Sequence, residues 1–310
     1  MKSLKLATSI CSCPEVDAAL GNKSHPCHRV VSVQDEMVAT DAQMRQRPEP
    51  WIGNIETARV LFLSSNPGLS DDPNIAERED FPTYKVSDQE AGNFFVNRFD
   101  QKNIPVHATF NHPTEPNFLV RCVDGNYRSG MKQQKRPQAT WQGIHDHAMA
   151  ILGEKCDPNK DYALTEIVHC KSKMAAGVEE ASSHCVDKWL MPILELSQAE
   201  IVFVMGSKVR DFFAIPLLEF AENFGSDKNK VYKSLSQRER ALRDIQISDF
   251  GGKKRLYVYC FHPTHAISPN TIEAMFGTQL LTWLQSLSMG QTQIPQSTEE
   301  LTKLINTYTN

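Results

Sequence analysis

Two short polar sequences follow apolar runs, and each contains a side chain suited to chemistry. Ser64-Ser-Asn-Pro-Gly68 follows one run, and His262-Pro-Thr264 follows another. An asparagine amide can orient a water molecule, and a histidine can donate a hydrogen bond to a developing negative charge. The proline after Asn66 and the proline after His262 restrict the backbone that aims each side chain. Each sequence alone is also typical of an ordinary turn.

The elements that must position these side chains are predicted to be strands of a parallel sheet. Short apolar runs without strict alternation, rich in Val, Ile, Leu and aromatic residues, are typical of strands covered on both faces. Helical patterns separate the runs, which predicts an α/β fold. Ligands of such sheets bind beyond the carboxyl ends of the strands, where both polar sequences lie. Strands are expected at 59–63, 162–168, 201–205 and 256–261, and helices at 141–152, 184–196 and 272–287.

The 310 residues are expected to form one domain with additions around the sheet. Residues 1–50 form a cysteine-bearing N-terminal arm, and residues 222–250 form a charged, exposed excursion. Residues 69–139 are an insertion or lid, because a connection of that length is usually functional or disordered. At 290–310 the sequence Ser297-Thr-Glu-Glu300 has a capping-box pattern, which predicts a surface helix.

Charge and hydropathy exclude some classes of protein. The net charge of -4 argues against a protein that coats nucleic acid through bulk charge, although it leaves room for a locally basic groove. Basic residues cluster at 128–136, 171–173 and 253–255, and each cluster also fits a solvated loop. No apolar run approaches the roughly 20 residues that span a bilayer. We therefore expect a cytoplasmic monomer without a membrane partner.

Three sequences in order resemble the motifs of the uracil-DNA glycosylase superfamily. Ser64-Ser-Asn-Pro-Gly68 is similar to its first motif, in which the mismatch-specific branch also has asparagine. His262-Pro-Thr264 is similar to its second motif, His-Pro-Ser. Between them, Thr165-Glu-Ile-Val-His-Cys-Lys-Ser172 resembles the Thr-Asn-Val-Val-Lys-Cys-Arg-Pro segment of the iron–sulfur branches. The resemblance implies a three-layer α/β/α fold with a central, mainly parallel four-stranded sheet.

The resemblance also implies a mechanism and DNA as the partner. The target nucleotide is flipped out of the stack into the pocket, and the glycosidic bond breaks through an oxocarbenium-like sugar. Asn66 would position the attacking water, and His262 would stabilise the negative charge of the departing base at its O2 atom. These two residues are the expected catalytic pair.

Glu166 departs from the family pattern. The matching residue of the iron–sulfur branches is an asparagine that reads uracil by accepting from N3–H and donating to O4. An ionised glutamate can only accept, whereas the N4 amino group of cytosine is a good donor to it. A protonated glutamate could also donate to cytosine N3. Glu166 therefore predicts a cytosine-type base if it faces the pocket, and the alternative is a structural ion pair with Lys171 or Lys173.

Other contacts to the base and to DNA follow from the same resemblance. An aromatic residue of the 69–139 insertion is expected to stack on the base, and a loop after the histidine motif is expected to insert an apolar wedge into the minor groove. The residues expected to contact the base are Ser65, Phe81 and Tyr84. Those expected to contact DNA are His265, Ile267, Lys171, Lys173 and Lys208, although solvent exposure explains the lysines equally well.

The cysteines are predicted to be thiols or metal ligands, because a cytoplasmic chain rarely forms disulfides. Cys170 and Cys185 match two cluster ligands of the iron–sulfur branches, whose other two ligands form Cys-x-x-Cys near the N-terminus. This chain has Cys11, Cys13 and Cys27 there instead, so the choice among them stays open. The resemblance implies a [4Fe–4S] cluster, with zinc or unmetallated cysteines as alternatives.

The sequence as a whole thus predicts a monofunctional DNA glycosylase that removes a modified cytosine-type base and leaves an abasic site. Removal of modified cytosine from phage DNA would be its role in defence. A uracil or mismatch repair glycosylase is one alternative. A non-catalytic relative that binds modified DNA is another, and an unrelated α/β enzyme acting on free nucleotides is a third.

Overall fold

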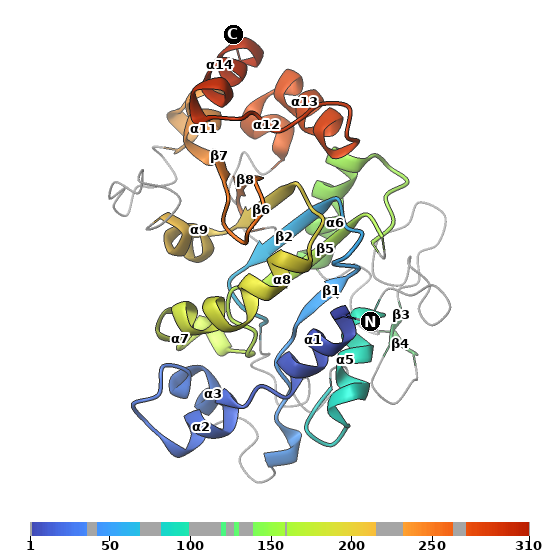
Figure 1. The fold of residues 1–310 in the computed structure, drawn as a ribbon, viewed down its shortest axis with the longest axis vertical. Coiled ribbons are helices and arrows are strands. Elements are labelled where there is room, and N and C mark those ends of the chain that lie inside the picture. The colour runs from blue at the N-terminus through green and yellow to red at the C-terminus, as the bar shows by residue number, and fades with distance from the viewer. Residues whose placement is uncertain are drawn as a thin grey trace.

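A six-stranded mixed sheet forms the centre of the fold (Figure 1). In the computed structural model the described residues are 2–35, 42–68, 82–98, 119–121, 127–129, 139–158, 160–214, 232–262 and 271–309. The sheet has the strand order β1-β5-β2-β6-β8-β7. The strands are β1 Trp51–Gly53, β2 Val60–Ser64, β5 Tyr162–Glu166, β6 Ile201–Met205, β7 Ile245–Ser248 and β8 Arg255–Cys260.

The four apolar runs are the four inner strands, which pair in parallel and are buried at every residue. The prediction of a four-stranded sheet is wrong, because β1 and β7 pair antiparallel with its two outer strands. Both additions are short edge strands, which need only one pairing partner and little apolar sequence. A separate hairpin joins β3 Leu119–Arg121 to β4 Tyr127–Ser129.

The order of the parallel strands defines where a ligand would bind. Numbered along the chain, the inner strands β5, β2, β6 and β8 stand in the order 2-1-3-4. The direction of winding therefore reverses between β2 and β6. Such a switch point leaves a crevice at the carboxyl ends of the strands, where doubly wound sheets bind their ligands.

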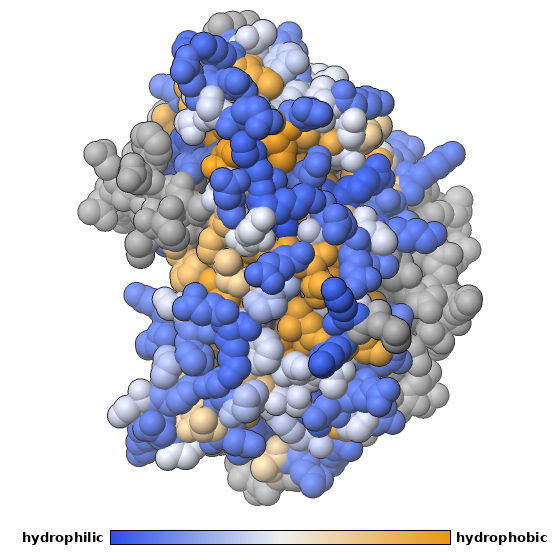
Figure 2. All heavy atoms as spheres, in the orientation of Figure 1, coloured by the Kyte–Doolittle hydropathy of each residue, from blue (hydrophilic) through white to orange (hydrophobic). Residues whose placement is uncertain are grey.

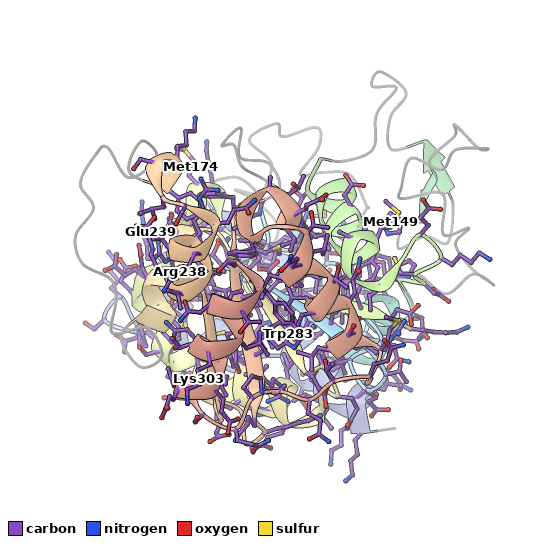
Figure 3. All side chains as sticks on the ribbon, turned by 90° about the horizontal axis from the view of Figure 1, so that it is seen from above. Met149, Met174, Arg238, Glu239, Trp283 and Lys303 are labelled. Carbon is purple, nitrogen blue, oxygen red and sulfur yellow. The ribbon has the colours of Figure 1, made fainter. Side chains whose placement is uncertain are left out.

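Helices cover both faces of the sheet, so the fold has three layers. Figure 1 shows α1 and α8 in front of the sheet, and Figure 3, seen from above, shows α6 on the opposite side. The helices of the first half are α1 Lys2–Cys11, α2 Glu15–Gly21, α3 His28–Asp35, α5 Asp88–Val96 and α6 Ala139–Leu152, with a 3-10 turn at Ala42–Met44. Those of the second half are α7 Val178–Cys185, α8 Met191–Leu196, α9 Ser207–Ala214, α11 Gln237–Asp244, α12 Ile272–Phe276, α13 Thr278–Ser288 and α14 Thr298–Tyr308.

Two predicted helices differ in detail from the observed ones. The helix expected at 184–196 begins earlier, at Val178, and runs through a π-helical turn at Val186–Leu190 into α8. The helix expected at 272–287 is divided into α12 and α13 by Gly277, whose φ of 90° lies outside the range of ordinary residues. The tail helix is present as α14, and the side chain of Ser297 caps it by accepting from the Glu300 N–H.

The segments described as an arm and as an excursion belong to the packed fold. In the N-terminal segment, Ala7 and Ile10 of α1 are fully buried, and α1 packs against α5. In the charged segment, residues 232–250 include α11 and the edge strand β7, and Asp244 is buried. This part of the segment therefore does not protrude along its whole length. In Figure 3, Arg238 of α11 lies beside α14, where its Nε donates to Asn306 at 2.7 Å.

Apolar side chains reach the surface only in separate patches on the face shown in Figure 2, with hydrophilic residues between them. Within the part of the chain that the structure describes, every helix is too short or too polar to cross a membrane.

Candidate active site and cysteine pocket

The end of β2 holds the Asn66 amide in a fixed orientation. Ser65 Oγ donates to Asn66 Oδ1 at 3.1 Å, and Asn66 Nδ2 donates to the Pro67 carbonyl at 2.8 Å. The carbonyl of Ser65 in turn accepts from the Val168 N–H at 3.0 Å, which ties this turn to the chain after β5. A carbonyl oxygen has two lone pairs, so Oδ1 can still accept a hydrogen bond from a water molecule.

His262 lies at the carboxyl end of β8, two strands away from Asn66. Gly206, at the end of the intervening strand β6, has φ 85°, and its N–H donates to the Cys260 carbonyl at 3.0 Å. A Cβ added to Gly206 would lie 3.4 Å from His262 Cβ. The half-buried His262 therefore stands directly against the β6 turn, and Asn66 and His262 flank that turn on either side.

Glu166 is the last residue of β5 and pairs in register with Ser64 of β2. Its side chain is buried, and its Oε2 atom has no hydrogen-bond partner among the described residues. Burial raises the pKa of Glu166 well above its ordinary value, and the nearby Glu49 raises it further. A hydrogen bond from Ser64 and the charge of Lys171 act in the opposite direction.

The three lysines expected at DNA do not share one surface. Lys171 is only 3% exposed and forms an ion pair with Glu49, which removes it from any phosphate-binding surface. A buried ammonium group needs a buried counter-charge, which Glu49 supplies. The prediction that Lys171 contacts DNA is therefore wrong. Lys173 is half-buried in the turn Lys173–Ala175, while Lys208 is exposed on α9.

A groove of about 730 Å³ lies between α7 and α9, next to the end of β5. Lys208 and Asp211 of α9 and Val178 of α7 line it, together with Ile167, which follows Glu166 in the chain. Beside this groove, Met174 is 87% exposed and has φ 50°, and Figure 3 shows it at the periphery of the molecule.

Tyr84 is half-buried and lies against Arg47. The Arg47 guanidinium lies 4.5 Å from the centre of its ring, and burial together with Cys170 raises its pKa. Its ring therefore packs on the cysteine-bearing side of the molecule and has one face covered. The other residues predicted to stack on the base or enter the minor groove, Phe81, His265 and Ile267, lie outside the described residues.

Four of the five candidate ligand cysteines surround one small, mainly apolar pocket. Cys13, Cys27, Cys170 and Cys185 line it, together with His169 and Trp189. They come from the loop before α2, the turn before α3, the segment after β5 and the end of α7. The π-helical turn that follows Cys185 brings Trp189 to the same pocket, where its Nε1 donates to Cys13 Sγ at 3.2 Å.

These four thiols are buried and free, and they influence each other. Burial raises the pKa of all four, to about 11 for Cys27 and to about 12 for Cys185. The other three cysteines raise the pKa of Cys170 further, which shows how closely the group is assembled. Hydrogen bonds from the Glu15 backbone to Cys13 and from the His169 backbone to Cys185 lower the pKa and so favour the thiolates.

The spacing of the four sulfur atoms is wider than a single zinc ion requires. Among the described residues, the one set of three possible ligand atoms that lie mutually within 4.8 Å is Glu15, His25 and His184, so no three of the sulfurs are that close. Zn–S bonds of 2.3 Å would place tetrahedral sulfur ligands roughly 3.8 Å apart.

The Glu15 set is better explained as an ion-pair centre than as a metal site. The Cys27 N–H donates to His25 Nδ1 at 3.1 Å, so the ring proton lies on Nε2, which donates to Glu15 at 3.0 Å. A histidine that binds metal normally donates its other N–H, which His25 cannot do here. Glu15 also pairs with Lys188 and His184, and these contacts lower its pKa to about 2.

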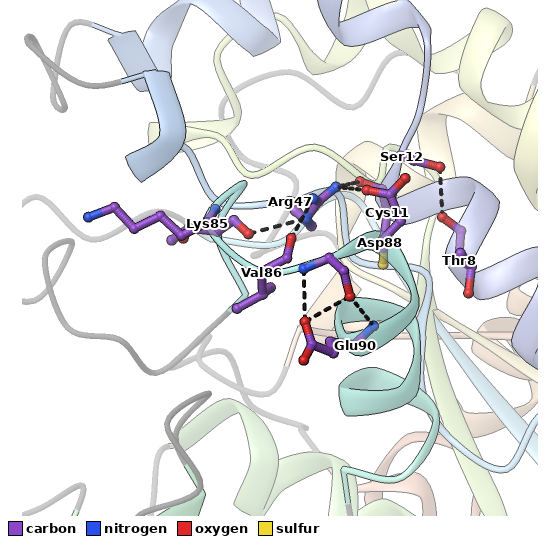
Figure 4. Close-up of polar contacts among 10 residues, drawn as sticks. Thr8, Cys11, Ser12, Arg47, Lys85, Val86, Asp88 and Glu90 are labelled. Atoms are coloured by element: carbon purple, nitrogen blue, oxygen red, sulfur yellow. Dashed lines mark hydrogen bonds and ion pairs between the residues drawn. The ribbon is translucent and has the colours of Figure 1, made fainter.

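Cys11 is the candidate ligand that the structure separates from the others. It is fully buried but does not line the cysteine pocket. Figure 4 shows its carbonyl held by Arg47, whose Nη1 donates to it at 3.1 Å and pairs with Asp88 at 2.6 Å. The same guanidinium donates to the Val86 carbonyl, so Cys11 ends α1 at a fixed point against the start of α5.

Sequence reasoning did not find Glu49, Trp189 or the role of Glu15. All three act through contacts with residues far away in the chain, and no local motif marks them. No protein-family model and no curated protein matches this sequence.

Proposed function

We propose that the protein is a monofunctional DNA glycosylase that hydrolyses the N-glycosidic bond of a flipped, modified cytosine-type base. The observation that carries this proposal is the arrangement of Asn66, Glu166 and His262 at the carboxyl ends of β2, β5 and β8, on both sides of the β2/β6 switch point. That crevice is where a doubly wound sheet binds its ligand. The resemblance of the three motifs to the uracil-DNA glycosylase superfamily supports the same reaction.

Each residue has one task in the proposed reaction. The Asn66 Oδ1 atom accepts a hydrogen bond from the attacking water, and the contacts to Ser65 and Pro67 keep it aimed. His262 donates to O2 of the departing base, where negative charge develops. Glu166 contacts the N4 and N3 edge of the base, because a carboxyl group there suits cytosine better than uracil.

The cysteine pocket is proposed to hold a [4Fe–4S] cluster through Cys13, Cys27, Cys170 and Cys185. The four buried thiols, their wide spacing and the N–H···S bond from Trp189 support this group over a single zinc ion. When bound, it would act structurally by joining the N-terminal helices to α7 and the segment after β5.

Base release from a panel of duplex DNAs tests the reaction. The substrates carry uracil, cytosine, hydroxymethylcytosine or glucosylated hydroxymethylcytosine at one position, and abasic sites are measured. We expect release from a cytosine-type substrate. Release of uracil alone would favour a repair glycosylase, and tight DNA binding without any release would favour the non-catalytic alternative.

The variant Asn66→Ala tests the catalytic assignment. Loss of a positioned water should lower the rate of base release by about 100-fold or more, while DNA affinity stays largely unchanged. Lys208→Ala is a suitable comparison, because Lys208 is exposed on α9 and should affect DNA affinity more than the rate. Equal loss of rate and affinity in Asn66→Ala would contradict a role in orienting water.

A further inference from the structure

The Glu166 carboxyl group has an unusual hydrogen-bonding state for a buried residue. Glu166 is 8% exposed, Ser64 is its neighbour on β2, and Oε2 has no hydrogen-bond partner among the described residues. Leaving a buried polar atom unpaired costs about 1–3 kcal/mol. A ligand that supplies the missing hydrogen-bond partner would account for the unpaired Oε2 atom.

The charges around Glu166 favour its protonated form. Among the described residues, the ammonium group that acts on it is that of Lys171, which already forms a buried ion pair with Glu49. Ionised Glu166 would therefore add a second buried negative charge beside one positive charge, which is costly. Arg98 acts on Lys171, and the Ser64 side chain also acts on Glu166. The raised pKa of Glu166 agrees with this charge balance.

Its place in the sheet puts this acid next to the proposed catalytic residues. Glu166 pairs with Ser64 across neighbouring strands, which lie about 4.8 Å apart. Asn66 follows Ser64 by two residues in the same turn. A base whose sugar lies over Asn66 can thus present its far edge to the end of β5.

We propose that Glu166 is a general acid, which donates a proton to N3 of the flipped cytosine-type base while the glycosidic bond breaks. This inference rests on the proposed function, because it requires a base without a proton on N3. Cytosine lacks that proton, so it would otherwise leave as an unfavourable anion. A hydrogen bond from His262 to O2 disperses this charge, and proton transfer to N3 removes it.

All protons and electrons are accounted for in this cleavage of the glycosidic bond. The bond from C1′ to N1 breaks, its electron pair stays with the ring, and the Glu166 proton adds to N3, so the base leaves neutral. Water adds to C1′ and loses one proton to the solvent. The Glu166 carboxylate regains a proton from the solvent before the next turnover, and no oxidant or reductant is needed.

Single-turnover base release between pH 5 and 9 tests this role. The wild type is compared with Glu166→Gln on DNA that carries the released cytosine-type base. We expect the wild-type rate to fall as pH rises through the pKa of Glu166. Glu166→Gln should be slower by about 10²- to 10⁴-fold and should lack that fall. Its thermal melting shows that the isosteric variant is folded.

Ser64→Ala provides a second measurement that does not remove the acid. The Ser64 hydrogen bond lowers the pKa of Glu166, so its loss should raise that pKa and extend the active range to higher pH. In 5-fluorocytosine, fluorine takes the place of any other substituent at C5 and stabilises the departing charge, so the defect of Glu166→Gln should shrink on that substrate.

The outcomes separate this inference from the proposed function. Proton donation by Glu166 would be overturned if Glu166→Gln kept the wild-type pH profile, or if its rate of base release fell by the same factor on every substrate. In either case, base release by the wild type would still support the proposed function. If the wild type releases no base from any substrate, the proposed function fails, and this inference fails with it.

Discussion

Single side chains in this protein take their roles from distant partners. Cys13 and Cys11 are two residues apart, yet only Cys13 reaches the pocket that Cys27, Cys170 and Cys185 line. Arg47 instead donates a hydrogen bond to the Cys11 carbonyl, and Cys11 does not line the pocket. Lys171 is similar: its neighbour Cys170 lines the pocket, while the lysine is buried against Glu49. Residue type alone did not distinguish these cases.

Replacement of single cysteines tests the proposed ligands. Cys13→Ser and Cys185→Ser should lower the iron and sulfide content of anaerobically purified protein by more than half, because each removes a thiolate from the pocket. Cys11→Ser is the matched control, since Cys11 is also buried and only two residues from Cys13 but lies outside the pocket. Full iron content in Cys13→Ser combined with loss in Cys11→Ser would reverse the assignment.

The buried Glu166 should also affect the pH dependence of stability. Its pKa is higher in the folded than in the unfolded protein, so its contribution is present below the ordinary pKa of 4.5 and is lost as pH rises towards the folded value. Glu166→Gln has no ionisable group at this position, so its stability does not fall with pH in this way. Between about pH 5 and the folded pKa of Glu166, the free energy of unfolding of the variant, measured by urea denaturation, should therefore gain on that of the wild type by about 1.4 kcal/mol per pH unit. A difference that stays constant with pH would show that Glu166 is ionised in both states.

At the scale of elements, a close backbone contact joins the N-terminal helix α3 to α7. Gly177, the residue before α7, has φ 74°, and a Cβ there would overlap Val30 N and lie 2.7 Å from the Arg29 carbonyl carbon. This contact packs α3 against the start of α7 and so sets the distance between Cys27 and Cys185. The π-helical turn after Cys185 then carries Trp189 to Cys13.

Gly177→Ala should destabilise the protein through this contact. Gly252→Ala is the matched control, because Gly252 has the same φ of 74° but nothing within 4 Å of an added Cβ. The control should lose roughly 1–2 kcal/mol from the left-handed backbone alone. Gly177→Ala should lose about 1–3 kcal/mol more, since α3 must move. Equal losses in urea denaturation would mean that the α3–α7 contact adjusts without strain.

At the scale of the whole molecule, the sheet and the cysteine pocket organise two different regions. The inner strands are buried on both faces and hold the candidate active site at their carboxyl ends. The N-terminal helices instead meet the pocket, the Glu15 ion pairs and the Arg47 contacts. Loss of the proposed cluster should therefore affect the two regions differently.

Removal of the proposed cluster by an iron chelator should loosen the N-terminal region selectively. Amide hydrogen exchange in α2 and α3 should increase at least tenfold, because their thiols lose a common ligand, while β2, β5, β6 and β8 keep their protection. Exchange that increases uniformly over the sheet would show that the group supports the whole fold. Unchanged exchange in α2 and α3 would contradict a structural role for it.

The sequence by itself determined the four inner strands, the alternation with helices, the tail helix and the polar turns that end the strands. These follow from local patterns of apolar residues, capping residues and Pro or Gly, which act over a few positions in the chain. Only the tertiary structure decided that β1 and β7 extend the sheet, that Lys171 is buried, that Tyr84 packs beside the cysteine pocket, and that Cys11 lies outside it. Each of these depends on a partner far away in sequence, such as Glu49 for Lys171 or Arg47 for Tyr84 and Cys11. The burial of charge and the meeting of thiols are properties of the folded arrangement, and no local pattern encodes them.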